Sequence, residues 1–334
     1  MRPAIDSYNN NSHPLVISHK DDLSLFHDDV LEGLSSDPKR LSSKYFYDKR
    51  GDELFQQIMN LPEYYLTGCE LEIFRLQTKS LINTITAGSS GPFDLIEMGV
   101  GDGTKSRYLL EGLLKDYHRF NYLPIDISGN VLGQLESNLT SLAELNLIPL
   151  EGEYFEMLAQ ATRFSSNRKV ILFLGANIGN MSKEESLEFC QNLRSNLLPG
   201  DLAIIGFDLK KNPHVILKAY NDPQGITSDF NLNLLERINS ELGGNFDVNK
   251  FTHYQTYDPE TGACKSYLVS SKAQTVKIDN VAIPFKEGEW IFMEVSQKFT
   301  LEEVENLAHD SGFSVSNHLT DSKGWFTDSI WTAI

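Results

Sequence analysis

Apolar and polar residues follow two different periodicities along this chain. After residue 92, short apolar runs alternate with longer stretches in which apolar residues recur at helical spacing. The first pattern is typical of buried strands and the second of the helices that cover them. The strand-like runs are Leu95–Met98, Tyr122–Ile125, Leu147–Leu150, Val170–Leu174 and Leu202–Phe207, and the helical stretches are 104–118, 128–144, 155–164 and 182–195. Such alternation predicts βαβ units and a parallel sheet.

The flanking segments have other patterns. Residues 20–85 predict helices with breaks at Pro38 and Pro62, and a further helix is expected at about 226–242. Residues 252–300 then alternate as strands do, and residues 301–334 predict a helix followed by one or two strands. We therefore expect an α/β protein whose Rossmann-like sheet is joined to a second, smaller α+β domain. The expected boundaries are an N-terminal extension at 1–40, a helical part of the substrate domain at 41–85, the cofactor-binding sheet at 86–208, a substrate-binding insertion at 209–300 and a return to the core sheet at 301–334.

A glycine-rich turn follows the first strand of this sheet. The apolar run from Phe93 leads into Gly99-Val-Gly-Asp-Gly103, and a helix is expected to begin near Thr104. Glycines there permit unusual backbone angles and let the main chain approach a ligand closely. Asp126 ends the next apolar run, where doubly wound folds place an acid that accepts hydrogen bonds from a ribose diol. The two features together predict a site for an adenosine-containing ligand.

The spacing of the turn indicates which ligand. A dinucleotide fingerprint requires Gly-x-Gly-x-x-Gly, whereas this chain has Gly-x-Gly-x-Gly preceded by an acid, Glu97. That pattern is typical of class I S-adenosylmethionine (SAM) methyltransferases, in which the upstream carboxylate lies near the cationic methionine end. We therefore favour SAM over NAD and expect Glu97, Gly99 and Gly101 to bind it. A plain strand–helix turn and an NAD enzyme are the alternatives.

Composition narrows the class of protein. Of the 334 residues, 40% are hydrophobic and 22% charged, which is ordinary for a globular enzyme. A net charge of −17 argues against nucleic acid as a partner. We find no apolar run long enough for a membrane span and no signal peptide at the N-terminus. Three scattered cysteines form neither a disulfide framework nor a zinc site. We expect a cytoplasmic monomer without a metal that acts on a small molecule.

Polar residues after the later strands are candidates for the substrate pocket, because ligands bind beyond the carboxyl ends of the strands in open α/β sheets. Glu153 follows the third strand, and the turn Gly175-Ala-Asn-Ile-Gly-Asn180 follows the fourth. The amide of Asn180 offers a donor and an acceptor, which suits an amino acid's amine and carboxylate. Asn180 could equally cap the next helix, and Glu153 could be a solvated surface acid.

From about residue 41 to the C-terminus, the chain resembles the histidine Nα-methyltransferases of the ergothioneine pathway. The resemblance is carried by long strings of residues in the same order. They are Lys44-Tyr-Phe-Tyr-Asp-Lys-Arg-Gly51, Leu54-Phe, Leu61-Pro-Glu-Tyr-Tyr65, the glycine turn ending in Lys105, Phe173-Leu-Gly-Ala-Asn-Ile-Gly-Asn180, Gly206-Phe-Asp-Leu, Ala219-Tyr-Asn-Asp-Pro-Gln-Gly225, Phe230-Asn-Leu-Asn and Glu294-Val-Ser-Gln-Lys-Phe299.

The resemblance implies roles for individual residues. SAM would be bound by Gly99, Lys105, Asp126, Glu153 and Tyr154. The amino-acid end of histidine would be held by Tyr64, Asn180 and Tyr220, with Tyr47 as the catalytic residue near the reacting amine. Glu294 and Ser296 would bind the imidazole, since a carboxylate accepts from one ring N–H and a hydroxyl can face the other nitrogen. Successive transfers would give the trimethylated product, hercynine.

The chain departs from the family pattern at several positions. The glycine turn is a more generic SAM turn, Glu153-Tyr154 replaces an Asp-Phe pair, and Ala176-Asn177 replaces a common Ser-Thr. Ser266 stands where an apolar methionine is common near the imidazole. Two alternatives therefore remain: a methyltransferase for another amino acid, a ring nitrogen or a histidine derivative, and a silent metabolite-binding protein.

Overall fold

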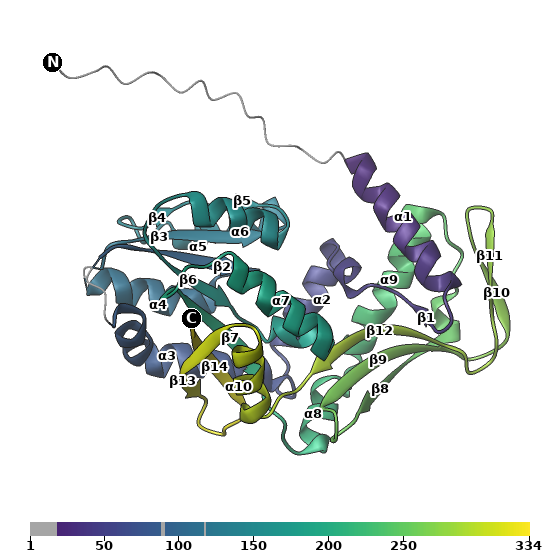
Figure 1. The fold of residues 1–334 in the computed structure, drawn as a ribbon. Coiled ribbons are helices and arrows are strands. Elements are labelled where there is room, and N and C mark those ends of the chain that lie inside the picture. The colour runs from purple at the N-terminus through teal and green to yellow at the C-terminus, as the bar shows by residue number, and fades with distance from the viewer. Residues whose placement is uncertain (1–18, 88–90, 117) are drawn as a thin grey trace.

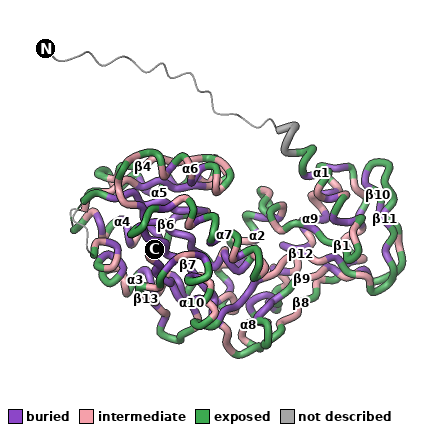
Figure 2. Tube along the Cα trace, in the orientation of Figure 1, coloured by how far each residue is buried: buried purple, intermediate pink, exposed green. Residues whose placement is uncertain are grey.

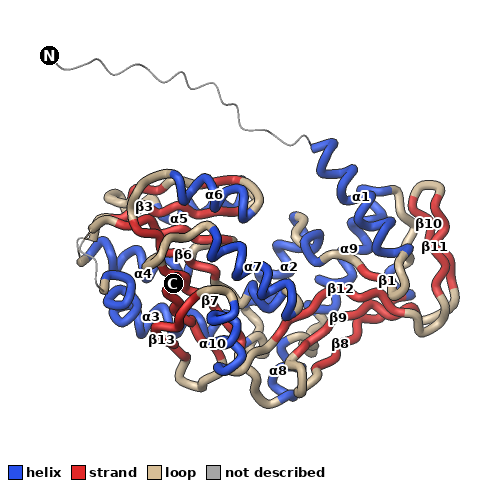
Figure 3. The backbone as a smooth tube through the Cα atoms, viewed as in Figure 1, coloured by secondary structure: helices blue, strands red, loops and turns tan. Residues whose placement is uncertain are grey.

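A computed structural model describes residues 19–334 except for 88–90 and 117. The part of the expected N-terminal extension that precedes residue 19 lies outside the described residues. Figure 1 shows a larger part built on a long sheet and a smaller part that holds a second sheet and a protruding hairpin. In Figure 3, helices lie on both sides of the strands of the larger part. The expected combination of a Rossmann-like sheet with a smaller α+β part is confirmed.

The large sheet has the strand order β13-β14-β7-β6-β2-β3-β4, with β5 also paired to β3. Its strands are β2 (Phe93–Met98), β3 (Phe120–Asp126), β4 (Asn146–Leu147), β5 (Leu150–Glu151), β6 (Arg168–Phe173), β7 (Leu202–Asp208), β13 (Phe313–Thr320) and β14 (Phe326–Ala333). β14 runs antiparallel to β7, while the pairs among β2, β3, β6 and β7 are parallel. Two short strands replace the expected run at Leu147–Leu150, because Pro149 between them has no N–H to donate.

Two hydrophobic cores cover the faces of this sheet. On one face pack α3 (Tyr65–Thr86), α4 (Thr104–Lys115) and α5 (Gly129–Leu139). On the other pack α6 (Tyr154–Arg163), α7 (Lys183–Ser195) and α10 (Leu301–Asp310). Neighbouring residues of β2 point to opposite faces, so Leu95 enters the first core and Ile96 the second. Figure 2 shows the central strands as buried and the outer surfaces of the helices as exposed.

The smaller part has a third core of its own. Its sheet has the order β1-β12-β9-β8, and β10 and β11 form a separate hairpin. Its elements are α1 (His19–Ser35), β1 (Lys39–Arg40), η1 (Ser43–Phe46), α2 (Lys49–Met59), α8 (Pro213–Ala219), α9 (Ile226–Leu242), η3 (Val248–Lys250), β8 (Phe251–Tyr257), β9 (Ala263–Ser270), β10 (Gln274–Ile278), β11 (Val281–Phe285) and β12 (Trp290–Gln297). Most of these elements belong to the insertion expected at 209–300.

Two helices pack against a different part of the molecule than the expected domain boundaries suggest. The boundaries themselves stay a prediction. Helix α1, within the expected extension 1–40, contributes Phe26, Val30 and Leu34 to the core of the smaller part. Helix α3, within the expected helical part 41–85, instead contributes side chains such as Ile73 and Phe74 to the core of the large sheet. In the described part of the chain, no helix is both long and apolar enough to cross a membrane.

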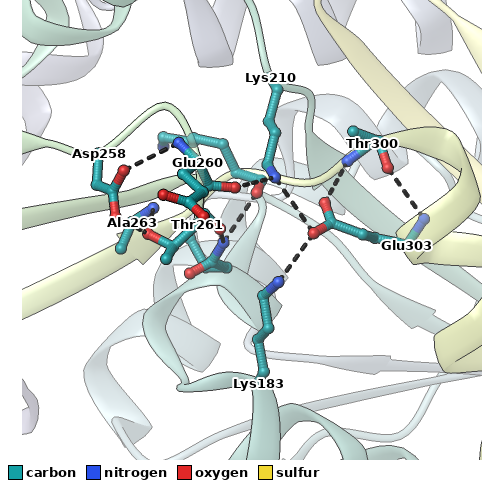
Figure 4. Close-up of polar contacts among 10 residues, drawn as sticks. Lys183, Lys210, Asp258, Glu260, Thr261, Ala263, Thr300 and Glu303 are labelled. Carbon is teal, nitrogen blue, oxygen red and sulfur yellow. Dashed lines mark hydrogen bonds and ion pairs between the residues drawn. The ribbon is translucent and has the colours of Figure 1, made fainter.

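Polar contacts join the large sheet and its helices to the smaller part (Figure 4). The ammonium of Lys210, which follows β7, donates to the Glu260 carbonyl in the β8–β9 turn at 3.1 Å and to Glu303 of α10 at 3.2 Å. Lys183 of α7 reaches the same Glu303 carboxylate at 2.8 Å. Thr300 and Glu303 also form a capping box that begins α10. The β8–β9 turn is thereby fixed against helices of the large sheet.

We expect the buried ion pair between Asp94 of β2 and Lys169 of β6 to matter for stability. The two residues lie opposite each other in the sheet, 2.6 Å apart, and both side chains are almost completely buried. Replacing Asp94 with Ala leaves a buried ammonium without its carboxylate, which should lower the free energy of unfolding by about 3–5 kcal/mol. Urea denaturation would measure this loss. Glu111→Ala, which breaks the exposed pair with Arg107, is the matched control and should cost less than about 1 kcal/mol. Equal losses would contradict the prediction.

Candidate active site

The glycine turn joins β2 to α4, and its backbone requires glycine. Gly99, Gly101 and Gly103 have φ values of 72°, 56° and 69°, in the left-handed region. A Cβ on Gly99 would lie 2.5 Å from the Tyr154 hydroxyl, and one on Gly103 would lie 2.2 Å from Leu135. Gly101 has no atom within 4 Å of such a position. The turn is therefore tightly packed on two sides, and at Gly101 its backbone is open to a ligand.

The acidic residue expected beside this turn is in place. Asp126 ends β3, half-buried, and its carboxylate accepts a hydrogen bond from the Ser128 amide at 3.0 Å. Burial raises the pKa of Asp126, although the backbone donors oppose the shift. The Gly99 amide binds the carbonyl of Ile125, so the turn and the acid lie together at the carboxyl edge of the sheet. Ile127, 68% exposed, follows the acid and offers an apolar surface that sequence reasoning did not identify.

Residues at the start of α6 border the same space. Tyr154 is the first residue of α6, and its hydroxyl lies against Gly99, while its ring packs edge-on against Phe173. Glu153 precedes the helix in an extended conformation, exposed and making no capping hydrogen bond. The structure thus brings Gly99, Asp126 and Tyr154 together, with Glu153 at the rim.

Glu97 differs from the expectation that it contacts the cofactor directly. It is only 2% exposed, and its carboxylate accepts hydrogen bonds from Ser106 and Tyr122, each at 2.6 Å. Ser106 belongs to α4 and Tyr122 to β3, so the carboxylate ties the first turn of α4 to the sheet beneath the glycine turn. Burial raises the pKa of Glu97 to about 7, against the lowering effect of these two donors. Its place is structural, below the binding surface.

Lys105 is held by an acid that the sequence did not reveal. Its ammonium forms an ion pair with Glu70 of α3, and Glu70 also accepts a hydrogen bond from the Gly175 amide at 2.7 Å. Burial lowers the pKa of Lys105, but the carboxylates of Glu70, Asp328 and Glu97 together raise it, so that the net shift is upward. Glu70 therefore links the helix after the glycine turn to the turn after β6. No local signal distinguishes this acid from a surface residue of α3.

The turn after β6 carries Asn180 into position. Gly175 and Ala176 both have left-handed φ values, 76° and 57°, and the second is unusual for a residue with a side chain. Gly179 lies so close to β12 that a Cβ would be 2.8 Å from the Gln297 carbonyl oxygen. Ser182, with a complete capping box, caps α7. The alternative role of Asn180 as the cap is therefore wrong, and its exposed side chain remains available to a ligand.

Three of the predicted tyrosines lie in one aromatic wall of the smaller part. Phe55 packs between Tyr47 at 5.6 Å and Tyr64 at 6.4 Å, and Tyr64 packs against Tyr220 at 6.0 Å between ring centroids. Burial raises the pKa of Tyr47, Tyr64 and Tyr220, and the nearby Glu294 carboxylate raises each further. The three phenols are therefore neutral at physiological pH and lie close to Glu294.

Glu294 lies on β12, half-buried, and among the described residues none donates a hydrogen bond to its carboxylate. Burial raises its pKa to about 7, while the charge of Lys298 opposes the shift. With Asn180 it also lines a cavity of about 310 Å³, whose other walls come from α1, residues 40–43, α7 and β12 and include none of the three tyrosines. Ser296, two residues further along β12, bonds to the Tyr220 hydroxyl at 2.8 Å. Glu294 is thus an acceptor open to a ligand beside a hydroxyl pair.

Ser266 lies beside this acid on the neighbouring strand. It lies on β9, opposite Glu294 in the sheet, and is 2% exposed. Its hydroxyl pairs with the Nε2 atom of His253 at 3.0 Å. Burial lowers the pKa of His253 to about 4, so this imidazole is neutral. The Ser266–His253 pair is therefore polar at the position where the family resemblance leads us to expect an apolar side chain near the imidazole.

The site can hold a small zwitterion between two kinds of surface. At the carboxyl edge of the large sheet lie backbone amides, an acid and a lysine. Across from them, the smaller part presents neutral phenols and the acceptor Glu294, and the turn after β6 adds the amide of Asn180. Tyr154 from the large sheet lies near Tyr47 of the smaller part. Both parts of the molecule therefore contribute to one site.

The raised pKa of Glu97 should make the free energy of unfolding depend on pH. Because the folded-state pKa of about 7 exceeds the ordinary 4.5, the protonated acid favours the folded state. Its stabilising contribution is complete below pH 4.5 and is lost as the pH rises through about 7. Glu97→Gln cannot titrate, so its free energy of unfolding should improve relative to the wild type between pH 5 and pH 8. Urea denaturation at intervals of one pH unit measures the difference, and parallel curves would rule the prediction out.

The chain is similar to known proteins along most of its length. The sequence profile of the family described as "Histidine-specific methyltransferase, SAM-dependent" matches residues 26–333. The Histidine N-alpha-methyltransferase of Mycolicibacterium smegmatis is 32% identical over 305 residues, which cover 90% of this chain and 93% of that protein. The protein of the same name from Mycobacterium tuberculosis is 33% identical, with the same coverage of both chains. Ergothioneine biosynthesis protein 1 of Schizosaccharomyces pombe is 30% identical over 83% of this chain and 36% of its own length.

These similarities cover both the large sheet and the smaller part, and the family match runs from α1 to the last strand. The expected resemblance is therefore confirmed. The chain belongs to the family of SAM-dependent, histidine-specific methyltransferases.

Proposed function

We propose that this enzyme transfers methyl groups from SAM to the α-amine of free L-histidine and that successive transfers yield Nα,Nα,Nα-trimethylhistidine, hercynine. The observation that supports it best is Glu294, a carboxylate with no hydrogen-bond donor among the described residues that lies close to the neutral phenols of Tyr47, Tyr64 and Tyr220. Such an acid suits a side chain with an N–H donor, as an imidazole has. The two mycobacterial relatives with the name Histidine N-alpha-methyltransferase support the same substrate.

The residues at the sheet edge fit SAM. The open backbone at Gly101 and the tight approach at Gly99 suit a ligand lying on the turn. Asp126 would accept hydrogen bonds from the ribose, Tyr154 and Glu153 would border the adenine, and Lys105 would face the carboxylate of the methionine end. SAM supplies an activated methyl group on a sulfonium, so the protein has to position the amine and need not activate the donor.

The substrate's amino-acid end would lie between Tyr64, Asn180 and Tyr220. The Asn180 amide can donate to the carboxylate and accept from the amine. Glu294 and Ser296, two residues apart on one face of β12, would bind the two ring nitrogens. These side chains come from four separate segments, since Glu294 and Ser296 share β12, so the pocket would recognise the complete amino acid.

Tyr47 would act as a neutral hydrogen-bonding residue. Burial and Glu294 raise its pKa, which disfavours a phenolate base at neutral pH. Its hydroxyl oxygen can nevertheless accept a hydrogen bond from the amine and orient the nitrogen lone pair. Although protein atoms around the phenol raise its pKa, 46% of the residue as a whole is exposed, so a proton can pass from the amine to solvent through adjacent water. Positioning of the neutral amine would then be the main source of rate.

A second candidate is a methyltransferase for another amino acid or a ring-modified histidine. The specific observation in its favour is the Ser266–His253 pair beside Glu294. Two more hydrogen-bonding groups there suit a side chain with an additional polar atom. We further infer that the enzyme works as a cytoplasmic monomer without nucleic acid or a membrane, in keeping with its net charge of −17.

Mass spectrometry of products tests the function. The pure protein is incubated with SAM and each of the twenty amino acids singly, together with the ring-methylated histidines. The proposal expects histidine to gain up to three methyl groups, all located on the α-nitrogen by fragmentation. Methylation of a ring nitrogen, or of a different amino acid while histidine stays unchanged, would refute it in favour of the second candidate.

Glu294→Ala should separate substrate binding from cofactor binding. Loss of the acceptor should weaken histidine binding by about tenfold to a hundredfold, since a buried ring N–H loses its partner. The affinity for S-adenosylhomocysteine should change less than twofold to threefold, because Glu294 lies in the other part of the molecule. Titration calorimetry with each ligand measures both values. Glu287→Ala, an exposed acid near the β11–β12 turn, is the control and should leave both unchanged. Equal weakening of both ligands by Glu294→Ala would contradict the assignment.

A further inference from the structure

One buried side chain behind the pocket has no role in the function proposed so far. Lys298 follows β12 directly and its side chain is 0% exposed. Its ammonium lies 2.6 Å from the Asp208 carboxylate, 2.7 Å from the Tyr220 hydroxyl and 2.8 Å from the Ser296 hydroxyl. It also lies 4.6 Å from the centroid of the Tyr220 ring. A charge buried this deeply requires compensating partners, and two of these partners belong to the predicted histidine pocket.

The backbone around Lys298 fixes where this ammonium can reach. The Lys298 amide donates to the Gly262 carbonyl at 2.8 Å, in the same β8–β9 turn that Lys210 holds in Figure 4. The next amide, that of Phe299, donates to the Asp208 carbonyl at 3.0 Å. A Cβ on Gly262 would lie 2.3 Å from the Lys298 carbonyl oxygen, so glycine is required for this close approach. The stem of Lys298 is thus anchored on both sides.

The number of protons on Lys298, Tyr220 and Ser296 limits the hydrogen bonds that these groups can offer to a ligand. An ammonium has three N–H donors and no lone pair, and Lys298 has three acceptors at hydrogen-bonding distance. It therefore donates to both hydroxyl oxygens. The hydroxyls of Tyr220 and Ser296 share one further hydrogen bond, at 2.8 Å, which uses one of their two protons. Because a phenol is the stronger donor of the two, Tyr220 donates to Ser296, so the Ser296 oxygen accepts from both Lys298 and Tyr220 and has no lone pair left. The remaining proton is that of Ser296, which meets a ligand as a donor.

This polarity complements that of Glu294. The carboxylate of Glu294, two residues before Ser296, accepts hydrogen bonds, whereas the hydroxyl pair donates one. A neutral imidazole matches both, because one ring nitrogen carries a proton and the other has a lone pair. An imidazolium has protons on both nitrogens, and one of them would face a donor. A ring with a single N–H and no second nitrogen would leave the hydroxyl pair without an acceptor.

We propose that Lys298 is a positioning residue that holds the Tyr220–Ser296 pair as a hydrogen-bond donor and thereby selects a neutral imidazole with one unprotonated nitrogen. This inference rests on the proposed histidine specificity and adds the protonation state of the ring that binds. Lys298 acts through the two hydroxyls and does not itself touch the substrate.

The test compares ligands that differ in one ring atom. L-histidine is compared with the two pyrrolylalanines, which keep one N–H in either ring position and replace the other nitrogen with carbon. Titration calorimetry in the presence of S-adenosylhomocysteine measures each affinity. The wild type should prefer histidine over the better pyrrolylalanine by about tenfold or more, because the pyrrole leaves the buried donor unpaired. In Lys298→Met the preference should fall to about twofold or less.

Lys211→Met is the matched control. Lys211 also pairs with Asp208 and its side chain is 5% exposed, but it contacts Tyr65 and not the hydroxyl pair. Removing it perturbs the same buried carboxylate and should leave the preference for histidine unchanged. If Lys298 had only a structural role, its loss would lower the affinities for all three ligands alike and preserve the ratio of the histidine affinity to the pyrrolylalanine affinity. The inference would be overturned if Lys298→Met left this affinity ratio unchanged. It would also be overturned if Lys211→Met reduced the preference for histidine as much as Lys298→Met does.

A measurement on the wild type covers the case in which Lys298→Met does not fold. Nitrogen-15 NMR of ring-labelled histidine in the complex with S-adenosylhomocysteine, near pH 7.5, should show one protonated and one unprotonated, hydrogen-bonded nitrogen. Two protonated nitrogens would overturn the inference while leaving histidine as the substrate. No binding of histidine by the wild type would instead refute the proposed function, so the two failures are distinguishable.

Discussion

A buried carboxylate, that of Asp208, holds together the chain segments on which the site depends. Asp208 ends β7, the last parallel strand of the large sheet, and its side chain is 0% exposed. It accepts hydrogen bonds from the Tyr65 hydroxyl at the start of α3 and from the ammonium groups of Lys211 and Lys298. Because a buried carboxylate is costly unless it is paired, these segments cannot separate without a large loss of free energy. The sheet edge and the smaller part are thereby fixed relative to each other.

The predicted pocket residues lie next to these contacts in the chain. Tyr64 precedes Tyr65, Ser296 lies two residues before Lys298, and Tyr220 receives a hydrogen bond from Lys298 directly. A displacement of the Asp208 carboxylate would therefore shift several pocket residues together. This explains how a pocket made from distant parts of the sequence can hold a small amino acid against a cofactor turn on the other side. Rigid surroundings are what positioning of an amine for methyl transfer requires.

Much of the fold was predictable because its signals are local. The glycine turn, the acid of Asp126 and the helix at 226–242 are each specified by a few neighbouring residues, and the structure has all three. Tyr64, Asn180 and Glu294 were identified by resemblance to a family and not by their pattern. In a strand, Glu294 alone would have been interpreted as facing solvent.

Other features were not predictable because they depend on contacts between distant residues. The burial of Glu97 depends on Ser106 and Tyr122, and the role of Glu70 depends on Lys105 and the Gly175 amide. Two of the partners of Lys298, Asp208 at the end of β7 and Tyr220 just after α8, are distant in the sequence, and no sequence spacing connects them to it. The position of α3 against the large sheet was missed for the same reason, since its apolar face fits either part until the partner surface is known.

A structure of the protein with S-adenosylhomocysteine and L-histidine bound together would test the central claim most directly. We predict that the α-amine lies between the glycine turn and Tyr47, with one ring nitrogen on the Glu294 carboxylate and the other on the Ser296 hydroxyl. Histidine bound with its ring toward the sheet edge, or held away from Glu294, would contradict the account.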